Sequence, residues 1–205
     1  MTENIERINR VVRFRRKYTA KEFFEFTKDK DEQYELINGR IYKTHAPLMA
    51  SPTVRHQRII RKLIALLSNY LDGKTCEVFV APLDVVLFKK AKDKEKDDAK
   101  NVFRPDIFVV CDPNKISENR INGAPDFVIE VASRSTTGVD CGIKLNAYMT
   151  FGVREYWIIS PESKCVLVYT KQKDGIIKFD SYSFNDKIKV SIFDDLEIDF
   201  KQSKL

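Results

Sequence analysis

Two almost continuously apolar runs, 102–110 and 125–132, constrain the fold of this chain more than any other feature. Runs of this kind are typical of β-strands that are covered on both faces, as in a sheet flanked by helices. A third strand is predicted over 78–88. Each of the two apolar runs contains an acid that is a candidate functional residue. Asp106 directly follows a proline, and Glu130 lies within FVIEVA. The rest of the chain must supply the helices that cover this sheet.

Helical periodicity and capping residues predict three helices. The segment 19–27 begins with a capping box formed by Thr19 and Glu22. A longer helix is predicted over 51–71, because a Ser-Pro pair opens it and Ile and Leu recur at three- and four-residue spacing. The third helix is predicted over 135–151, with Ser and Thr caps at its start and a glycine after its end.

Turn dipeptides predict antiparallel strands before and after this central region. Asn38-Gly39 separates two short strands, 34–37 and 40–43, and is the dipeptide that best tolerates positive φ at both turn positions. Four more strand segments follow the last helix, and Asp174-Gly175 marks one of their turns. These segments are 155–159, 165–169, 176–183 and 188–200. The sum is an α/β fold with a mixed β-sheet flanked by helices.

Composition predicts one soluble domain. The 205 residues are 43% hydrophobic and 32% charged, so we expect a single folded domain over 1–205 with a basic N-terminal arm over about 1–17. The absence of a long apolar segment or signal region predicts a cytoplasmic protein with no membrane partner. The four cysteines are widely spaced and are expected to be reduced structural thiols. The net charge of +6 favours a polyanionic partner.

Glu130 is the most informative residue, because a carboxylate in so apolar a strand is costly unless something compensates its charge. A buried ion pair with Lys or Arg is one interpretation, and a metal ligand or general base is the other. Neighbouring strands lie about 4.8 Å apart, so Asp106 and Glu130 can share one hard cation. Asp126 is four positions from Glu130 on one strand, roughly 13 Å away, and is expected to be a cap or turn acceptor at the strand entrance.

Lys144 is unexpected on the helix stripe that should face the sheet. It shares this stripe with Ala147, Tyr148 and Phe151, at offsets of three, four and seven. One interpretation is that its side chain reaches the surface or pairs with Glu130 for structural reasons. The other is that its ammonium orients a water nucleophile or stabilises charge on a phosphate.

Several stretches together resemble the Uma2 family of restriction-endonuclease-like proteins, a bacterial branch of the PD-(D/E)XK nuclease superfamily. They are YELINGRIY, SPTVRHQRIIRKL, RPDIFVV, GAPDFVIEVASRSTTGVDCGIKLNAYMTFGVREYWIIS and the hairpin that follows, and they cover nearly all of 34–169 in the family's order. The resemblance implies a restriction-endonuclease-like core. It also implies that Asp106 is the PD aspartate and Glu130 the (D/E) residue. Ala132 occupies the usual lysine position, and Lys144 matches the lysine that family members supply from the following helix.

Three further residues match positions where this family favours the same residue types. Glu35 is either a cross-strand charge of its hairpin or an accessory metal or water contact. His56 is either a hydrogen-bonded residue at a helix end or a phosphate contact. Asp84 is either an additional ligand on a neighbouring strand or a residue without a role in the site.

The function predicted from these residues is metal-dependent endonucleolytic cleavage of DNA. Asp106 and Glu130 would bind Mg²⁺ or Mn²⁺, and Lys144 would help to position the attacking water. Cleavage of both strands would suggest a twofold homodimer. One alternative is a catalytically inactive nucleic-acid-binding or assembly protein that retains the nuclease fold, and another is a purely structural interaction domain. A glycine-rich phosphate loop, a nucleophile elbow and a zinc signature are all missing from the sequence.

Overall fold

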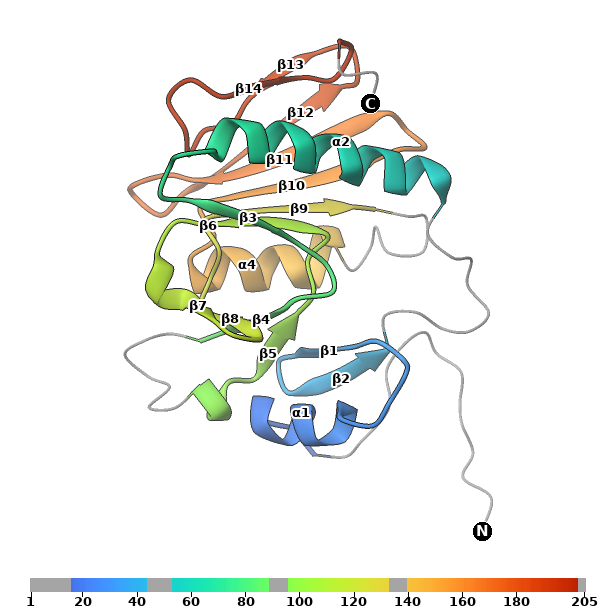
Figure 1. Cartoon of the computed structure of the whole chain (residues 1–205), viewed down its shortest axis with the longest axis vertical. Coiled ribbons are helices and arrows are strands. Elements are labelled where there is room, and N and C mark those ends of the chain that lie inside the picture. The colour runs from blue at the N-terminus through green and yellow to red at the C-terminus, as the bar shows by residue number, and fades with distance from the viewer. Residues whose placement is uncertain (1–15, 44–52, 89–95, 133–139, 203–205) are drawn as a thin grey trace.

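Two six-stranded sheets, and not the one mixed sheet expected from the sequence, form the centre of the computed structural model (Figure 1). The structure describes residues 16–43, 53–88, 96–132 and 140–202. In spatial order, the first sheet contains β2 (Arg40–Lys43), β1 (Tyr34–Ile37), β5 (Asn101–Phe103), β4 (Asp84–Leu87), β8 (Arg120–Asn122) and β7 (Ile116–Ser117). The second contains β12 (Ile177–Ser183), β11 (Cys165–Lys171), β10 (Glu155–Ser160), β9 (Phe127–Val131), β6 (Ile107–Val110) and β3 (Glu77–Val80).

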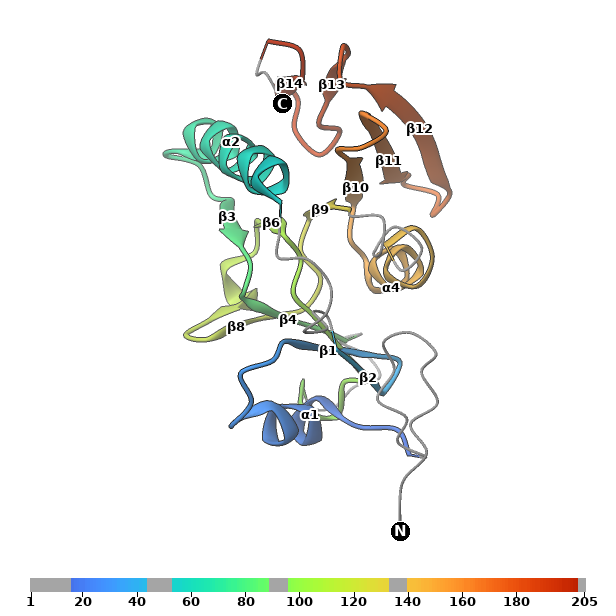
Figure 2. The same ribbon diagram turned by 90° about the vertical axis from the view of Figure 1, so that its right-hand side faces the viewer.

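In the described part of the chain, three α-helices pack on these sheets, which agrees with the predicted α/β class. α1 (Ala20–Thr27) packs beside β1 of the first sheet, and α2 (Val54–Leu71) covers one face of the second (Figures 1 and 2). α4 (Leu145–Phe151), which follows a π-helical turn at Asp140–Lys144, packs in a core that contains residues of both sheets. The two faces of the second sheet are therefore covered by different helices, as its apolar strands require.

Two of the predicted strands are broken in the structure, and this is why there are two sheets. The segment predicted over 78–88 becomes β3 and β4, and the segment predicted over 102–110 becomes β5 and β6. Each break contains a proline, Pro82 or Pro105, which has no N–H to donate to a strand ladder. The chain therefore passes between the two sheets at each break.

The local turn and cap predictions are mostly confirmed. Thr19 and Glu22 form the capping box of α1, with N–O distances of 2.9 Å and 3.2 Å. Asn38 and Gly39 have φ values of 51° and 79°, as their hairpin requires. The predicted start of α2 is wrong, because Thr53 is its N-cap and accepts a hydrogen bond from the His56 N–H at 3.1 Å. Ser51 and Pro52 lie outside the described residues.

The C-terminal region forms the predicted meander with one difference. β10, β11 and β12 are consecutive antiparallel neighbours, while the last segment, predicted over 188–200, is the separate hairpin β13 (Lys187–Lys189) and β14 (Glu197–Asp199). The helix predicted over 135–151 is described only from Asp140 and ends at Phe151, where Gly152 has a φ of 106°. The caps predicted for it lie outside the described residues.

The expectation of four reduced cysteines is wrong for one pair. Cys76 and Cys111 form a disulfide across β3 and β6, next to the register pair Glu77 and Val110. The sequence separation of 35 positions hid this contact from the sequence. Cys141 and Cys165 take no part in a disulfide.

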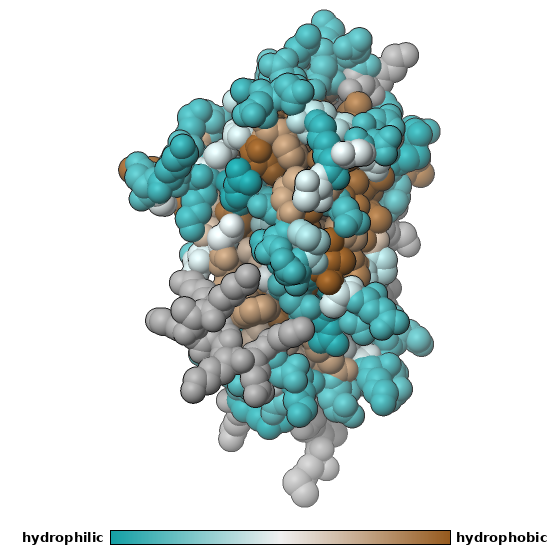
Figure 3. Space-filling model, turned by 60° about the vertical axis from the view of Figure 1, so that its left-hand side comes forward, coloured by the Kyte–Doolittle hydropathy of each residue, from teal (hydrophilic) through white to brown (hydrophobic). Residues whose placement is uncertain are grey.

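The face shown in Figure 3 is mainly hydrophilic, with patches of apolar residues near its middle. In the described part of the chain, the large exposed apolar side chains are Val54, Leu66, Val80, Ile143, Ile176, Ile177 and Phe179. Within the described residues, none of the helices combines the length and the apolar character that crossing a membrane requires.

Candidate active site

Asp106 and Glu130 come together where β6 and β9 meet. Ile107 pairs with Ile129 in the antiparallel register, so the next position along the ladder sets Asp106 opposite Glu130. Side chains of directly opposed antiparallel residues project from the same face of the sheet. The Asp106 N–H lies 3.4 Å from Glu130 Oε2, and Asp106 Oδ2 accepts a hydrogen bond from the Val131 N–H at 2.8 Å. The two acids predicted to meet are therefore neighbours in one site.

The two oxygens of the Glu130 carboxylate have different surroundings. Oε1 accepts hydrogen bonds from Lys144 Nζ at 2.9 Å and from the Tyr148 hydroxyl at 3.1 Å, whereas Oε2 faces the Asp106 N–H. Glu130 is only 5% exposed, so its charge depends on these donors. α4 and the turn before it supply both donors, because residues four apart lie on the same side of a helix. Tyr148 was predicted only as a member of the stripe, and its contact with Glu130 was missed.

Lys144 is buried between two carboxylates. Its Nζ lies 2.9 Å from Glu130 Oε1 and 3.0 Å from Glu35 Oε1, and the residue is 7% exposed. Glu35 also accepts a hydrogen bond from the Arg104 N–H at 3.0 Å. Glu35, which lies on β1, therefore links two other parts of the site. It contacts the start of α4 through Lys144 and the β5–β6 junction through Arg104. Lys144 does not reach the surface, so only the pairing with Glu130 and a role in catalysis remain among its predicted alternatives.

His56 reaches the site from the first turn of α2. Its Nε2 lies 3.4 Å from Asp106 Oδ2, and among the described residues no partner reaches its buried Nδ1. Thr53, the N-cap residue, holds this turn by accepting the His56 N–H. His56 is therefore both the helix-end residue that the sequence suggested and a direct neighbour of the Asp106 carboxylate.

Asp84 has a different place from the other acids. Its Oδ1 accepts a hydrogen bond from Arg104 Nε at 2.6 Å, and its Oδ2 lies 3.4 Å from Arg104 Nη2. This two-point contact is the geometry that a guanidinium and a carboxylate favour. Because the Arg104 main-chain N–H binds Glu35, the pair fixes the chain just before Asp106. Asp84 enters the site as the partner of Arg104, which the sequence did not suggest.

Asp126 is set apart from the site, as its spacing from Glu130 predicted. It accepts the Cys111 N–H at 2.9 Å and lies 3.5 Å from Arg154 Nη1. It is thus an acceptor at the entrance of β9.

The donor set suits a small, hard cation. Both contacts of the Asp106 carboxylate in the described residues are made by Oδ2, so Oδ1 has no partner among them, and the side chain is 22% exposed. In the described ranges, no three His, Cys, Asp and Glu side chains are arranged to hold a metal ion by themselves. Mg²⁺ commonly keeps several waters and takes one or two carboxylates from a protein. Asp106 and Glu130 match this number of carboxylates.

A family model described as "putative restriction endonuclease" matches residues 20–201, which is most of the chain and contains every residue of this site. The chain belongs to the Uma2 family. This Uma2 protein is 26% identical over 175 residues to the uncharacterized protein slr1290 of Synechocystis, and the match covers 85% of each chain.

A solved structure has the same fold. It is the crystal structure of "a putative nuclease belonging to DUF820" from Anabaena variabilis, with a TM-score of 0.68. The match covers 90% of this chain and 96% of that one, at 18% sequence identity. The restriction-endonuclease-like family expected from the motifs is therefore confirmed, and the α/β fold is one that a protein described as a nuclease also has.

Proposed function

We propose that this Uma2 protein is a metal-dependent endonuclease that hydrolyses phosphodiester bonds in DNA. The observation that carries the proposal is the meeting of Asp106 and Glu130 beside a buried lysine. One acid is enough to pair with one base, but among the described residues Lys144 contacts two carboxylates and a third, Asp106, lies next to them. An excess of acids around an accessible carboxylate is typical of a cation site.

Asp106 and Glu130 would hold Mg²⁺ or Mn²⁺ through their carboxylates. When bound, such an ion polarises a phosphate oxygen and lowers the pKa of a coordinated water. Lys144 and Tyr148 donate to Glu130 Oε1, so they hold this carboxylate in one orientation and keep its other oxygen toward Asp106. His56, which lies on α2, orients the Asp106 carboxylate through its contact with Oδ2. Lys144 would also stabilise negative charge that develops on the phosphate.

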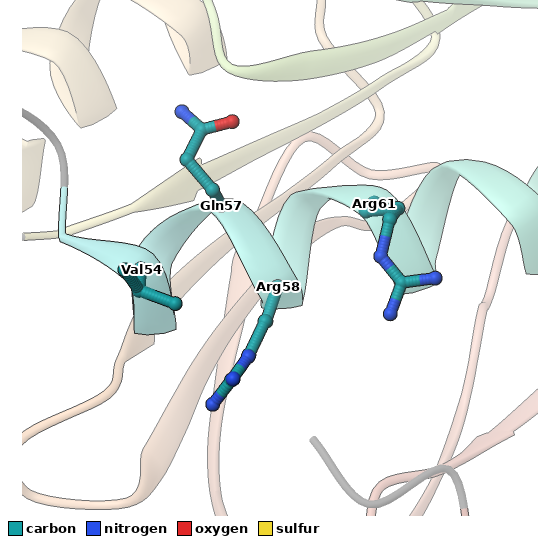
Figure 4. Close-up of a pocket in the computed structure, with 4 residues that line it drawn as sticks. All are labelled: Val54, Gln57, Arg58 and Arg61. Carbon is teal, nitrogen blue, oxygen red and sulfur yellow. The ribbon is translucent and has the colours of Figure 1, made fainter.

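The exposed face of α2 supports an anionic substrate. Arg55, Arg58 and Arg61 are all exposed, and the same helix contributes His56 to the site. Arg58 and Arg61 extend from one side of α2 beside a shallow pocket that Val54 and Gln57 also line (Figure 4). Arginines at three-residue spacing on a helix form a row, and guanidinium groups bind phosphates well. We propose that this row binds the DNA backbone away from the scissile phosphate, because Arg58 and Arg61 project from the side of α2 opposite His56.

Nicking of supercoiled plasmid in the presence of Mg²⁺ or Mn²⁺ tests the proposal. Asp106→Asn and Glu130→Gln should each lower the rate at least about a hundredfold, since the interactions of a metal ion supply several kcal/mol to such reactions. Asp126→Asn is the matched control, because Asp126 also follows a proline at the start of a strand but lies outside the site. It should cut like the wild type. Salt-sensitive DNA binding without cleavage would favour the inactive alternative.

A second measurement separates metal binding from catalysis. Glu35 and Glu130 are equally buried and both contact Lys144, but only Glu130 faces Asp106. Mn²⁺ should raise the melting temperature of the wild type and of Glu35→Gln, and should not raise that of Glu130→Gln. An equal rise in melting temperature in both variants would show that Glu130 is not part of the cation site.

A further inference from the structure

β12 is an edge of the second sheet whose outer side is not covered by any described element. The spatial order of that sheet begins with β12, and Figure 2 shows it on the outside, with β11 on its inner side. Its seven residues, Ile177–Ser183, all pair with β11. A long, regular edge strand is a template for another strand, and proteins usually shorten, bend or cover such edges.

The hydrogen bonds to β11 fix which main-chain groups of β12 point outward. The Gln172 N–H donates to the Ile176 carbonyl, and the Phe184 N–H donates to the Lys164 carbonyl. Bonded and non-bonded pairs alternate along an antiparallel ladder, so the even-numbered residues of β12 bond to β11. The N–H and C=O groups of Ile177, Phe179 and Ser181 therefore face the open edge.

The same residues expose apolar side chains at this edge. Ile177 is 45% exposed and Phe179 is 53% exposed, and Ile176 just before the strand is 64% exposed. The Phe179 ring lies 5.0 Å from that of Tyr169, at the end of an aromatic row that continues to the buried Tyr156. Apolar side chains gathered at an unpaired strand are typical of an interaction surface.

Charge determines what fits this edge. Lys178 and Asp180 lie on the same side of β12, with Nζ and Oδ2 2.8 Å apart. In an antiparallel pair of two β12 strands, outward-facing residues must meet outward-facing residues, so the register can change only in steps of two. If Phe179 faces its own copy, each Lys178 lies opposite the Asp180 of the other chain. A shift in one direction would set Lys178 against Lys178, and a shift in the other would set Asp180 against Asp180.

We infer that β12 pairs with β12 of a second copy of this chain, antiparallel and centred on Phe179, to form a twofold homodimer. The two Lys178–Asp180 contacts fall at non-hydrogen-bonded pairs, where opposed side chains approach most closely. The interface uses the same patch on both copies, as a twofold dimer requires. The inference does not depend on the nuclease proposal, although a dimer of this kind would carry two copies of the site.

The interface is small, because stable interfaces commonly bury about 1,200–2,000 Å² and one strand pair buries less. We therefore expect the dimer to dissociate at roughly 1–100 µM. Sedimentation velocity of the full chain across this range, in reducing buffer to prevent links through Cys141 and Cys165, should show a reversible monomer–dimer equilibrium. Phe179→Lys should weaken it at least about tenfold. A wild type that stays monomeric at several hundred micromolar would overturn the inference.

Two charge variants test the register itself. Lys178→Asp and Asp180→Lys each set like charges against each other in a homodimer, so each variant should be monomeric where the wild type is dimeric. An equal mixture restores both opposite-charge contacts and should form the mixed dimer, which native mass spectrometry distinguishes from either homodimer by mass. Because recovery on mixing requires two folded proteins, misfolding cannot produce it. Dimers that persist in the single variants, or a mixture that stays monomeric, would exclude this pairing.

Discussion

Lys144→Met is the substitution whose effect on stability is most clearly set by the structure. It removes a cation that lies 2.9 Å from Glu130 and 3.0 Å from Glu35, two carboxylates that are 5% and 4% exposed. Removing one partner of a buried ion pair commonly costs about 3–5 kcal/mol, because the remaining charge is left uncompensated. Tyr148 and the Arg104 N–H still donate to these carboxylates, so we expect about 3 kcal/mol.

Urea unfolding at pH 7.5 with a chelator, at low protein concentration, measures this cost. Lys43→Met is the matched control, because Lys43 Nζ is also 2.9 Å from a carboxylate, that of Glu32, but the glutamate side chain is 48% exposed. An exposed pair contributes at most about 1 kcal/mol. Adding Glu130→Gln to Lys144→Met should restore part of the loss, since it removes one of the two stranded charges. The reasoning is refuted if Lys144→Met costs no more than Lys43→Met.

Three other substitutions test separate parts of the structure. Tyr148→Phe should lower stability by about 1.5–3 kcal/mol in urea unfolding, because it removes a hydrogen bond to a charged group while the ring keeps its contacts with Phe103 and Tyr156. Thr53→Ala should cost about 1 kcal/mol through the lost α2 cap, with Thr19→Ala giving a similar loss at α1 as a comparison. Burial raises the pKa of Glu155 to about 7, so its contribution to stability should fall by up to about 3 kcal/mol as the pH rises from about 4.5 to about 7. Urea midpoints at pH 5 and pH 8 should show this fall in the wild type and not in Glu155→Gln.

The sequence predicted those features that depend on neighbouring residues. The capping box at Thr19, the turn at Asn38-Gly39 and the helix end at Gly152 each need only a few consecutive residues, and all three are present. The meeting of Asp106 and Glu130 was also predictable, because an acid at the start of one apolar strand meets an acid near the end of the next once the two strands pair antiparallel. Local geometry and the pairing of β6 with β9 were therefore enough to predict that Asp106 and Glu130 meet.

Features that depend on distant contacts were not predictable from one sequence. The Cys76–Cys111 disulfide required the β3–β6 register, and the Asp84–Arg104 pair required a side-chain direction at a strand junction. The division into two sheets had a visible signal, because Pro82 and Pro105 interrupt the two predicted strands. Each proline was compatible with the start of a strand, so the sequence alone did not indicate a change of sheet.

The displaced lysine follows from the packing around Glu130. Ala132, two residues further along the chain, is 4% exposed and belongs to the apolar core that includes α4 residues Ala147 and Tyr148. A long side chain at 132 would have to displace these neighbours. An ammonium supplied by Lys144 reaches Glu130 from the start of α4, so the helix can pack closely on the sheet and still provide the charge.

The charge balance of the site gives a reason for a divalent ion. Among the described residues, Glu35, Asp106 and Glu130 are three carboxylates around one ammonium, that of Lys144, while Asp84 and Arg104 neutralise each other. Counted over these described groups, two negative charges remain in excess. Repulsion between partly buried carboxylates is costly, and one divalent cation at Asp106 and Glu130 would cancel it. Glu35→Gln would reduce the excess to one, so Mn²⁺ should still bind this variant, but with lower affinity than the wild type.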